Sequence, residues 1–160
     1  MMKPNIQTRH LFLIGLGASV LLLIGCSYLT NFVVVNASDD SVKVRYRFKR
    51  ATDPLAPRRS STVPHVKAVS ELNQEVPWRE FSSSQYSFDP DSGTVVVSLE
   101  PGEALQLEVL NLTDKHYDAS DFAIEEIDIT GTHGEIKLEG EQVYKGFVVE
   151  SKKLLAVTYR

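Results

Sequence analysis

The sequence predicts an all-β fold, an antiparallel β-sandwich of the immunoglobulin-like or fibronectin-like kind, after an N-terminal apolar segment expected to be a signal or anchor helix. Apolar and polar residues alternate with a period of two in several short segments after residue 31. Clusters rich in Gly, Asp, Asn and Pro separate these segments, as turns separate strands. No helical stripe lies between them, which favours a sandwich or barrel over a parallel sheet with crossover helices.

The first strands are expected in residues 31–35 and 42–49. In the second of these segments, four apolar residues alternate strictly with four cations, so one face is apolar and the other cationic. The apolar residues are Val42, Val44, Tyr46 and Phe48, and the cations are Lys43, Arg45, Arg47 and Lys49. Turn formers fill residues 36–41. We therefore expect the two strands to form a hairpin.

Further strands are predicted after the first pair, at 94–99, 104–110, 124–129, 135–138, 143–149 and 154–159. The turn signals between them are typical of short hairpins and lie at 91–93, 100–103, 131–134 and 139–141. Proline, arginine and serine interrupt the pattern at about 50–65, which predicts a long loop. Residues 66–75 are expected to form a short strand or one or two helical turns. The aromatic residues expected at a sheet edge or beneath the loop are Trp78, Phe81, Tyr86 and Phe88.

The domain organisation follows from length and composition. Residues 1–25 are expected to be a signal peptide, 26–30 a tether whose lipidation is implied by the motif described below, and 31–160 a single sandwich domain with the long loop. The chain has 160 residues, of which 42% are apolar and 24% charged, so the mature part can bury one core without disulfides. Enzymes built on a barrel of eight βα units are excluded by size.

The N-terminal segment has the plan of an export signal. Lys3 and Arg9 precede a run at 11–25 that is apolar except for one serine and three glycines. As a helix this run is about 22 Å long, whereas a bilayer core is about 30 Å thick. An uncleaved single-pass anchor is the alternative, because counting on to residue 35 gives a window long enough to span.

The apolar run ends in Leu23-Ile24-Gly25-Cys26, and Cys26 is the only cysteine of the chain. This string resembles the lipobox of bacterial lipoproteins at all four positions. The resemblance implies that the Cys26 sulfur accepts diacylglycerol, that a signal peptidase recognises Leu23, Ile24 and Gly25 and cuts before Cys26, and that the new amino terminus receives an acyl chain such as palmitate. Two or three chains hold a protein at a membrane, whereas one binds only marginally.

The expected location is therefore the bacterial cell envelope, where the protein is held at the membrane by its lipid anchor. Residue 27 is Ser rather than Asp, and by the same resemblance this favours the outer membrane, facing the periplasm, in a Gram-negative cell. Removal of Lys3 and Arg9 with the signal takes the net charge from −4 to −6. Nucleic-acid binding is not expected, because it needs a cationic surface.

The cations Lys43, Arg45, Arg47 and Lys49 are the candidate contact with an anionic membrane surface or an envelope polyanion. Two other interpretations fit them. They can form a solvated outer face that discourages edge pairing. They can also pair with the acidic strands of residues 81–150, which hold fifteen acids against three bases.

No metal, soluble cofactor or catalytic site is assigned. An acidic cluster lies in an expected loop between the strands predicted at 104–110 and 124–129. It comprises Asp114, His116, Asp118 and Asp121, and its spacing does not match a calcium loop. Motifs for a serine nucleophile or a phosphate loop are absent. We therefore expect a non-enzymatic protein whose only added groups are the diacylglycerol and N-acyl chains on Cys26.

The functional hypothesis is a lipid-anchored protein that presents a small β-sandwich to a protein or polymer of the envelope. The alternative is a module that binds a carbohydrate or small molecule. In that case Trp78, Tyr86 and Tyr117 are expected to surround one exposed groove as a stacking platform.

Overall fold

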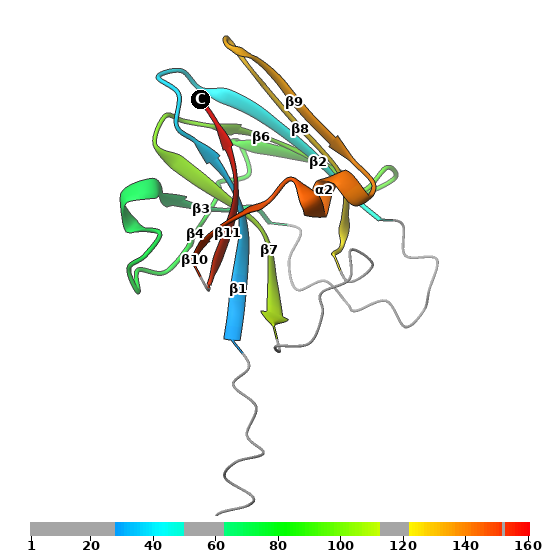
Figure 1. Cartoon of the computed structure of the whole chain (residues 1–160). Helices are drawn as coiled ribbons and strands as arrows, with labels where there is room; N and C mark the ends of the chain where they lie inside the picture. Colours follow the sequence, from blue (N-terminus) through cyan, green and yellow to red (C-terminus); the bar gives the residue numbers. More distant parts are fainter. Residues whose placement is uncertain (1–27, 50–62, 113–121, 152) are drawn as a thin grey trace, which may run out of the picture.

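Two sheets packed face to face make up the computed structural model, which describes residues 28–49, 63–112, 122–151 and 153–160 (Figure 1). The six-stranded sheet has the order β10-β11-β1-β7-β3-β4, and the five-stranded sheet has the order β5-β6-β2-β8-β9. The strands of the first sheet are β1 (Tyr28–Asn36), β3 (His65–Ala68), β4 (Arg79–Glu80), β7 (Glu103–Leu112), β10 (Val148–Ser151) and β11 (Leu154–Tyr159). Those of the second are β2 (Val42–Phe48), β5 (Tyr86–Asp89), β6 (Thr94–Leu99), β8 (Ile124–Gly131) and β9 (Gly134–Glu139).

Neighbouring strands run antiparallel except β1 and β11, which run parallel. The predicted all-β antiparallel sandwich is confirmed. Strands β6 and β11 have the predicted bounds. Strand β2 ends at Phe48, one residue before the predicted end, and β1 begins at residue 28, three residues before the predicted strand. Two short helical elements complete the described chain, a 3-10 turn η1 (Val69–Glu71) and α2 (Glu141–Lys145).

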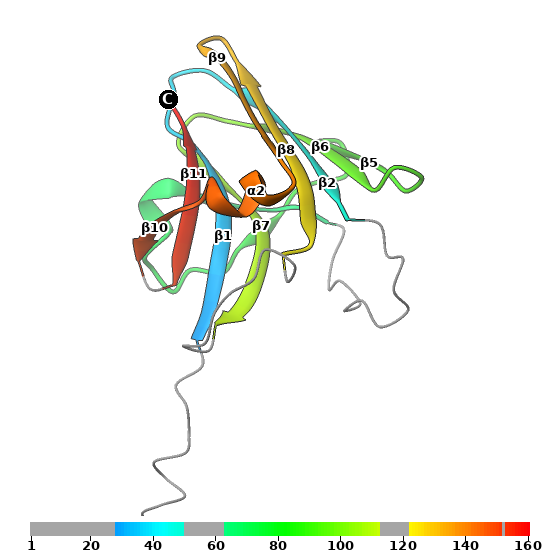
Figure 2. The same cartoon turned by 45° about the vertical axis from the view of Figure 1, so that its right-hand side comes forward.

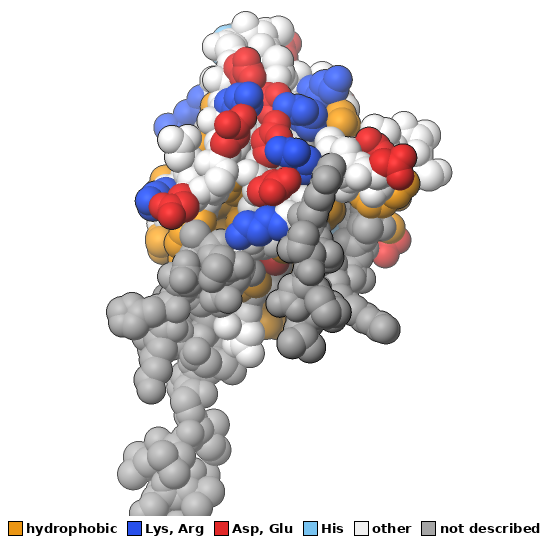
Figure 3. All heavy atoms as spheres, turned by 90° about the vertical axis from the view of Figure 1, so that its right-hand side faces the viewer, with side chains coloured by type: hydrophobic (Ala, Val, Ile, Leu, Met, Phe, Trp, Pro, Cys, Tyr) orange, Lys and Arg blue, Asp and Glu red, His pale blue; other side chains and the backbone are white. Residues whose placement is uncertain are grey.

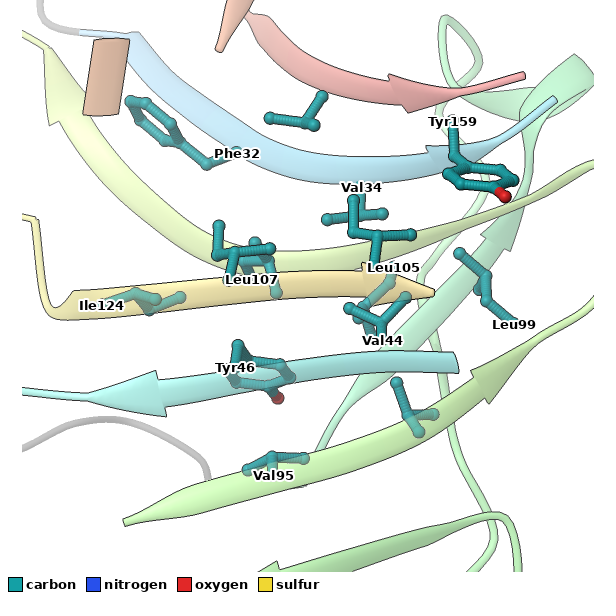
Figure 4. Packing of buried hydrophobic residues seen from close by; sticks show 14 of the residues in the cluster. Phe32, Val34, Val44, Tyr46, Val95, Leu99, Leu105, Leu107, Ile124 and Tyr159 are labelled. Carbon is teal, nitrogen blue, oxygen red and sulfur yellow. The ribbon is translucent and has the colours of Figure 1, made fainter. Parts of the chain in front are cut away.

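Strand β1 is buried on both faces. Phe32 and Val34 point into the main core between the sheets (Figure 4). Val33 and Val35 point the other way, into a smaller apolar cluster on the outer face of the six-stranded sheet. Trp78 and its neighbours in the segment 69–78 cover that cluster. The run of four apolar residues in β1 is explained by these two environments.

The alternation in β2 has the predicted consequence. Val42, Val44 and Tyr46 are buried and face the other sheet, while Arg45 and Arg47 lie on the outer face and are half-exposed. Burial of a valine side chain stabilises a fold by about 1.5 to 3 kcal/mol. A shift of register by one residue would bury the arginines instead, so the pattern also fixes the register.

The expected hairpin at 36–41 is wrong, because β1 and β2 lie in different sheets. The connection from β1 to β2 therefore crosses from one sheet to the other, and the fully buried Asn36 stabilises it. Its Nδ2 donates to Asp40 O at 2.8 Å and to Leu99 O, in the other sheet, at 3.0 Å. Its Oδ1 accepts from the Ser38 hydroxyl at 2.7 Å, and its backbone O accepts from Gly102 N at 2.9 Å. The turn at 100–103 likewise joins the two sheets, whereas 91–93 and 131–134 close true hairpins.

The strand predicted at 143–149 is also wrong in its first half. Residues 141–145 form α2, which buries Val143 and carries an ion pair between Glu141 and Lys145 at 2.8 Å, one helical turn apart. Only Val148–Ser151 is extended, as the edge strand β10. Both expectations for 66–75 hold, because β3 covers its first residues and η1 follows. Most of the long loop, 50–62, lies outside the described residues.

We predict that Asn36→Ala lowers the free energy of unfolding by about 2 to 4 kcal/mol, because it removes two buried donors and leaves Leu99 O without this partner. Urea denaturation of a soluble chain of residues 27–160 measures the change. Asn73→Ala is the control, since Asn73 is exposed. The control is expected to stay within about 0.5 kcal/mol of the wild type. Equal stability of the two variants would contradict the role of Asn36.

Candidate functional site

The chain enters the sandwich at the first residue of β1. The string Leu23-Ile24-Gly25-Cys26 lies outside the described residues, so the lipidation site itself stays a prediction. Tyr28 is the first residue of β1 and pairs with Leu112 at the end of β7. Both strands reach the same end of the sandwich, while the carboxyl terminus lies at the opposite end (Figures 1 and 2).

The position of β1 bears on the alternative of an uncleaved anchor. The apolar window that is long enough to span a bilayer extends to residue 35. However, residues 28–36 form β1 and belong to the sandwich. The apolar segment available to a bilayer therefore ends before Tyr28. Within the described ranges, no helix is long and apolar enough to cross a membrane.

The cations on the outer face of β2 form the cationic stripe, and two of them, Arg45 and Arg47, form ion pairs with acids of the neighbouring strand β8. Arg45 Nη2 lies 2.6 Å from Glu126 Oε1 and 3.2 Å from Asp128 Oδ2. Arg47 Nη2 lies 2.8 Å from Glu126 Oε2, and its Nε lies 3.3 Å from Glu125 Oε1. The two oxygens of Glu126 thus bind one arginine each.

The burial of these groups differs. The side chain of Glu126 is 11% exposed, whereas those of Arg45 and Arg47 are 43% and 42% exposed. A carboxylate removed from water needs compensating donors, and here it has two guanidinium groups. Arg45 and Arg47 therefore supply the hydrogen-bond donors and the positive charge that the nearly buried Glu126 needs.

The edge strand β9 extends this array of charges. Lys137 Nζ lies 2.8 Å from Glu139 Oε1, and this contact holds the pKa of Glu139 below its usual value, with smaller contributions from Arg47 and Arg45. The same contact raises the pKa of Lys137. Both side chains stay charged around neutral pH.

Blue and red side chains accordingly alternate over the outer face of the five-stranded sheet (Figure 3). A hollow of about 550 Å³ on this face is lined by Arg45, Arg47, Asp89 and Glu126 among others, so it presents both signs of charge. The pairing of β2 cations with acidic strands, one of the two structural interpretations, is observed for both arginines. Contact of Lys43, Arg45, Arg47 and Lys49 with an anionic surface stays a prediction, and it would have to compete with the acids of β8.

A second hollow, of about 490 Å³, lies on the outer face of the six-stranded sheet. Trp78 lines it together with Asn31, Lys67, Asn73 and Lys153. Lys67 is buried; its Nζ donates to Gln74 O at 2.8 Å and lies 5.7 Å from the centre of the Trp78 ring. The half-buried indole therefore packs against the outer apolar cluster and a cation while its remaining surface borders the hollow.

The structure describes two of the three aromatic residues expected to surround one groove, Trp78 and Tyr86. Trp78 covers the six-stranded sheet, whereas Tyr86 belongs to β5 of the five-stranded sheet and packs against the main core. These two residues do not line one groove, and Tyr117 lies outside the described residues. The loop residues Asp114, His116, Asp118 and Asp121 also lie outside them. Among the described residues, no group of three His, Cys, Asp or Glu side chains is placed to bind a metal ion.

Sequence reasoning offered the pairing of the β2 cations with acidic strands but did not name the acids, and it missed the hollow beside Trp78. The acids that bind the β2 arginines were visible as Glu126 and Asp128, which alternate with Ile127 and Ile129 in the same manner as the cations of β2. The hollow beside Trp78 had no sequence signal, because it forms where segments distant in the chain meet. Comparisons with family models, with curated proteins and with solved structures found no match.

We predict that Arg45→Gln combined with Arg47→Gln lowers the free energy of unfolding by about 1 to 3 kcal/mol, because the nearly buried Glu126 loses both cations. Urea denaturation of residues 27–160 measures it, with Lys43→Gln as the control. Sedimentation with anionic vesicles, run on the same proteins, tests the competing interpretation. Loss of vesicle binding at unchanged stability would show that the stripe is a contact surface and that its pairing with β8 is secondary.

Proposed function

We propose that the protein is an exported, non-enzymatic lipoprotein of the bacterial envelope, held in a membrane by acyl chains on Cys26, and that its sandwich binds a protein or polymer of the envelope. The observation that carries the proposal is the position of Cys26. The only cysteine stands at the end of an apolar run, at the fourth position of a lipobox-like string, and the folded domain begins two residues later.

The bounds of β1 support cleavage over an uncleaved span. Phe32 to Val35 are buried in the sandwich and cannot also lie in a bilayer. As a helix, the remaining apolar residues, about 15 to 17 of them, would be about 22 to 25 Å long, shorter than the hydrocarbon core of about 30 Å. A segment of that length suits a signal that is removed.

The lipid is expected on Cys26 alone, as diacylglycerol on its sulfur and an acyl chain on its new amino group. In cells fed an alkyne analogue of palmitate, the wild-type protein is expected to carry the label and to migrate as a chain lacking 25 residues. Cys26→Ser removes the acceptor, so this variant is expected to lose the label and to keep the full-length size.

A matched control moves the cysteine into the folded domain. Cys26→Ser combined with Ser41→Cys keeps a thiol in the chain, at an exposed position, but takes it away from the apolar run. It is expected to behave like Cys26→Ser. Labelling of either variant at the wild-type level would overturn the proposal, and so would an unlabelled wild type.

A second candidate, binding of a carbohydrate or another small polar molecule, is favoured by the hollow beside Trp78. An indole surface beside amide and ammonium groups offers stacking and hydrogen bonds at one place. Trp78 is the only tryptophan of the chain, so its fluorescence reports on this hollow alone.

Titration with soluble fragments of envelope polysaccharide is expected, under this second candidate, to give a saturable change in Trp78 emission. Asn73→Ala is expected to weaken binding by about tenfold, since a hydrogen bond contributes about 0.5 to 1.5 kcal/mol. Ser98→Ala, on the other sheet, serves as control and is expected to have no effect. A change that does not saturate, or that Asn73→Ala leaves as it is, rules the hollow out as the binding site.

A further inference from the structure

The connection between the anchor and the fold is very short. Only Ser27 separates Cys26 from the first residue of β1. Two steps of the chain reach at most about 7 Å. The headgroup region on one side of a bilayer is about 5 to 8 Å thick. A domain connected in this way stays against the headgroups, and the beginning of β1 lies at their depth.

Two apolar side chains are exposed at this end of the sandwich. Asn31 pairs with Val109, and Leu29 stands two residues before Asn31, so the three side chains share the outer face of the six-stranded sheet. Leu29 is 61% exposed and Val109 is 42% exposed. The segment 69–78 covers the cluster of Val33 and Val35 higher on this face. Leu29 and Val109 therefore form an apolar pair where the chain leaves the fold.

A cation accompanies the pair. Lys153 precedes β11, and its backbone O accepts a hydrogen bond from Asn31 N at 2.9 Å. Lys153 is exposed and has no ion pair among the described residues. An apolar pair beside an ammonium group matches the layer where lipid tails meet phosphates.

We infer that the end of the sandwich bearing Leu29, Val109 and Lys153 docks on the lipid surface that holds the anchor. This inference rests on the proposed anchoring at Cys26 and adds an orientation to it. The strands rise from the membrane, β1 over about 30 Å for its nine residues. The turn at 36–41 then faces away from the bilayer, toward any partner in the envelope.

Reporter cysteines test the orientation, because acylation leaves Cys26 without a free thiol. The native lipidated protein carries Val109→Cys or, as the control at the opposite end, Asp39→Cys, each labelled with a fluorophore. The proteins are reconstituted in vesicles of phosphatidylethanolamine and phosphatidylglycerol that include a lipid with a nitroxide on its headgroup. The label at 109 is expected to be quenched several-fold more strongly than the label at 39.

A spacer variant shows whether the short connection is the cause. Insertion of about ten Gly and Ser residues after Ser27 adds a flexible chain with a root-mean-square length of about 18 Å. The domain can then leave the headgroups, so quenching at 109 is expected to fall toward the value at 39 while the protein stays in the vesicles.

Failure of the docking and failure of the anchoring give different results. Equal quenching of both labels in a protein that remains bound to the vesicles overturns the docking and leaves the anchoring intact. Quenching at 109 that disappears when the protein is diluted in the membrane also overturns the docking. The quenching then comes from the fluorophore of a second copy on this surface and not from the nitroxide lipid. A protein that carries no acyl chains and does not enter the vesicles overturns the anchoring on which both depend.

Discussion

The structure depends on β1, a strand paired on both edges and buried on both faces. Its first residue lies two positions after Cys26, and its last residue, Asn36, ties the two sheets together through Leu99 O and Asp40 O. Tyr159, which pairs with Asn36, also joins the two sheets at this end of β1. Its hydroxyl accepts from His133 N at 3.0 Å and donates to Gly134 O at 3.1 Å, both at the turn between β8 and β9. Strand β1 is thus the centre of the core as well as the strand that follows the expected lipidation site.

The two outer faces of the sandwich have different chemistry. On the five-stranded sheet, Glu126 binds Arg45 and Arg47, and the exposed charges of both signs largely balance one another. On the six-stranded sheet, the segment 69–78 covers an apolar cluster and leaves a polar hollow beside Trp78. The first face is suited to staying in water and away from strand pairing. The second face has a polar hollow of a size suited to a small ligand and, near the beginning of β1, the exposed apolar residues Leu29 and Val109.

Local patterns predicted most of the strands, although not β4 and β5, and did not predict which sheet each strand joins. The alternation that begins at Val42 predicted β2, which ends one residue before Lys49, because only one register buries the apolar residues. The turn formers at 36–41 predicted a hairpin, yet the side chain of Asn36 reaches the other sheet, and that contact has no local signature. Residues 143–149 have strand propensity, but packing of Val143 and the Glu141–Lys145 pair favour a helix there. The paired arginines were predictable as one of several interpretations, whereas the hollow at Trp78 depends on tertiary contacts alone.

The central claim is that a sulfur atom two residues before a rigid sandwich carries enough hydrocarbon to hold it in a bilayer. Intact mass spectrometry of the protein purified from its native membrane tests this claim most directly. The account predicts a chain that begins at Cys26, has lost residues 1–25, and is heavier than residues 26–160 by a diacylglycerol group and an acyl chain. A chain that begins at Met1, with a Cys26 thiol that reacts with an alkylating reagent, would contradict it.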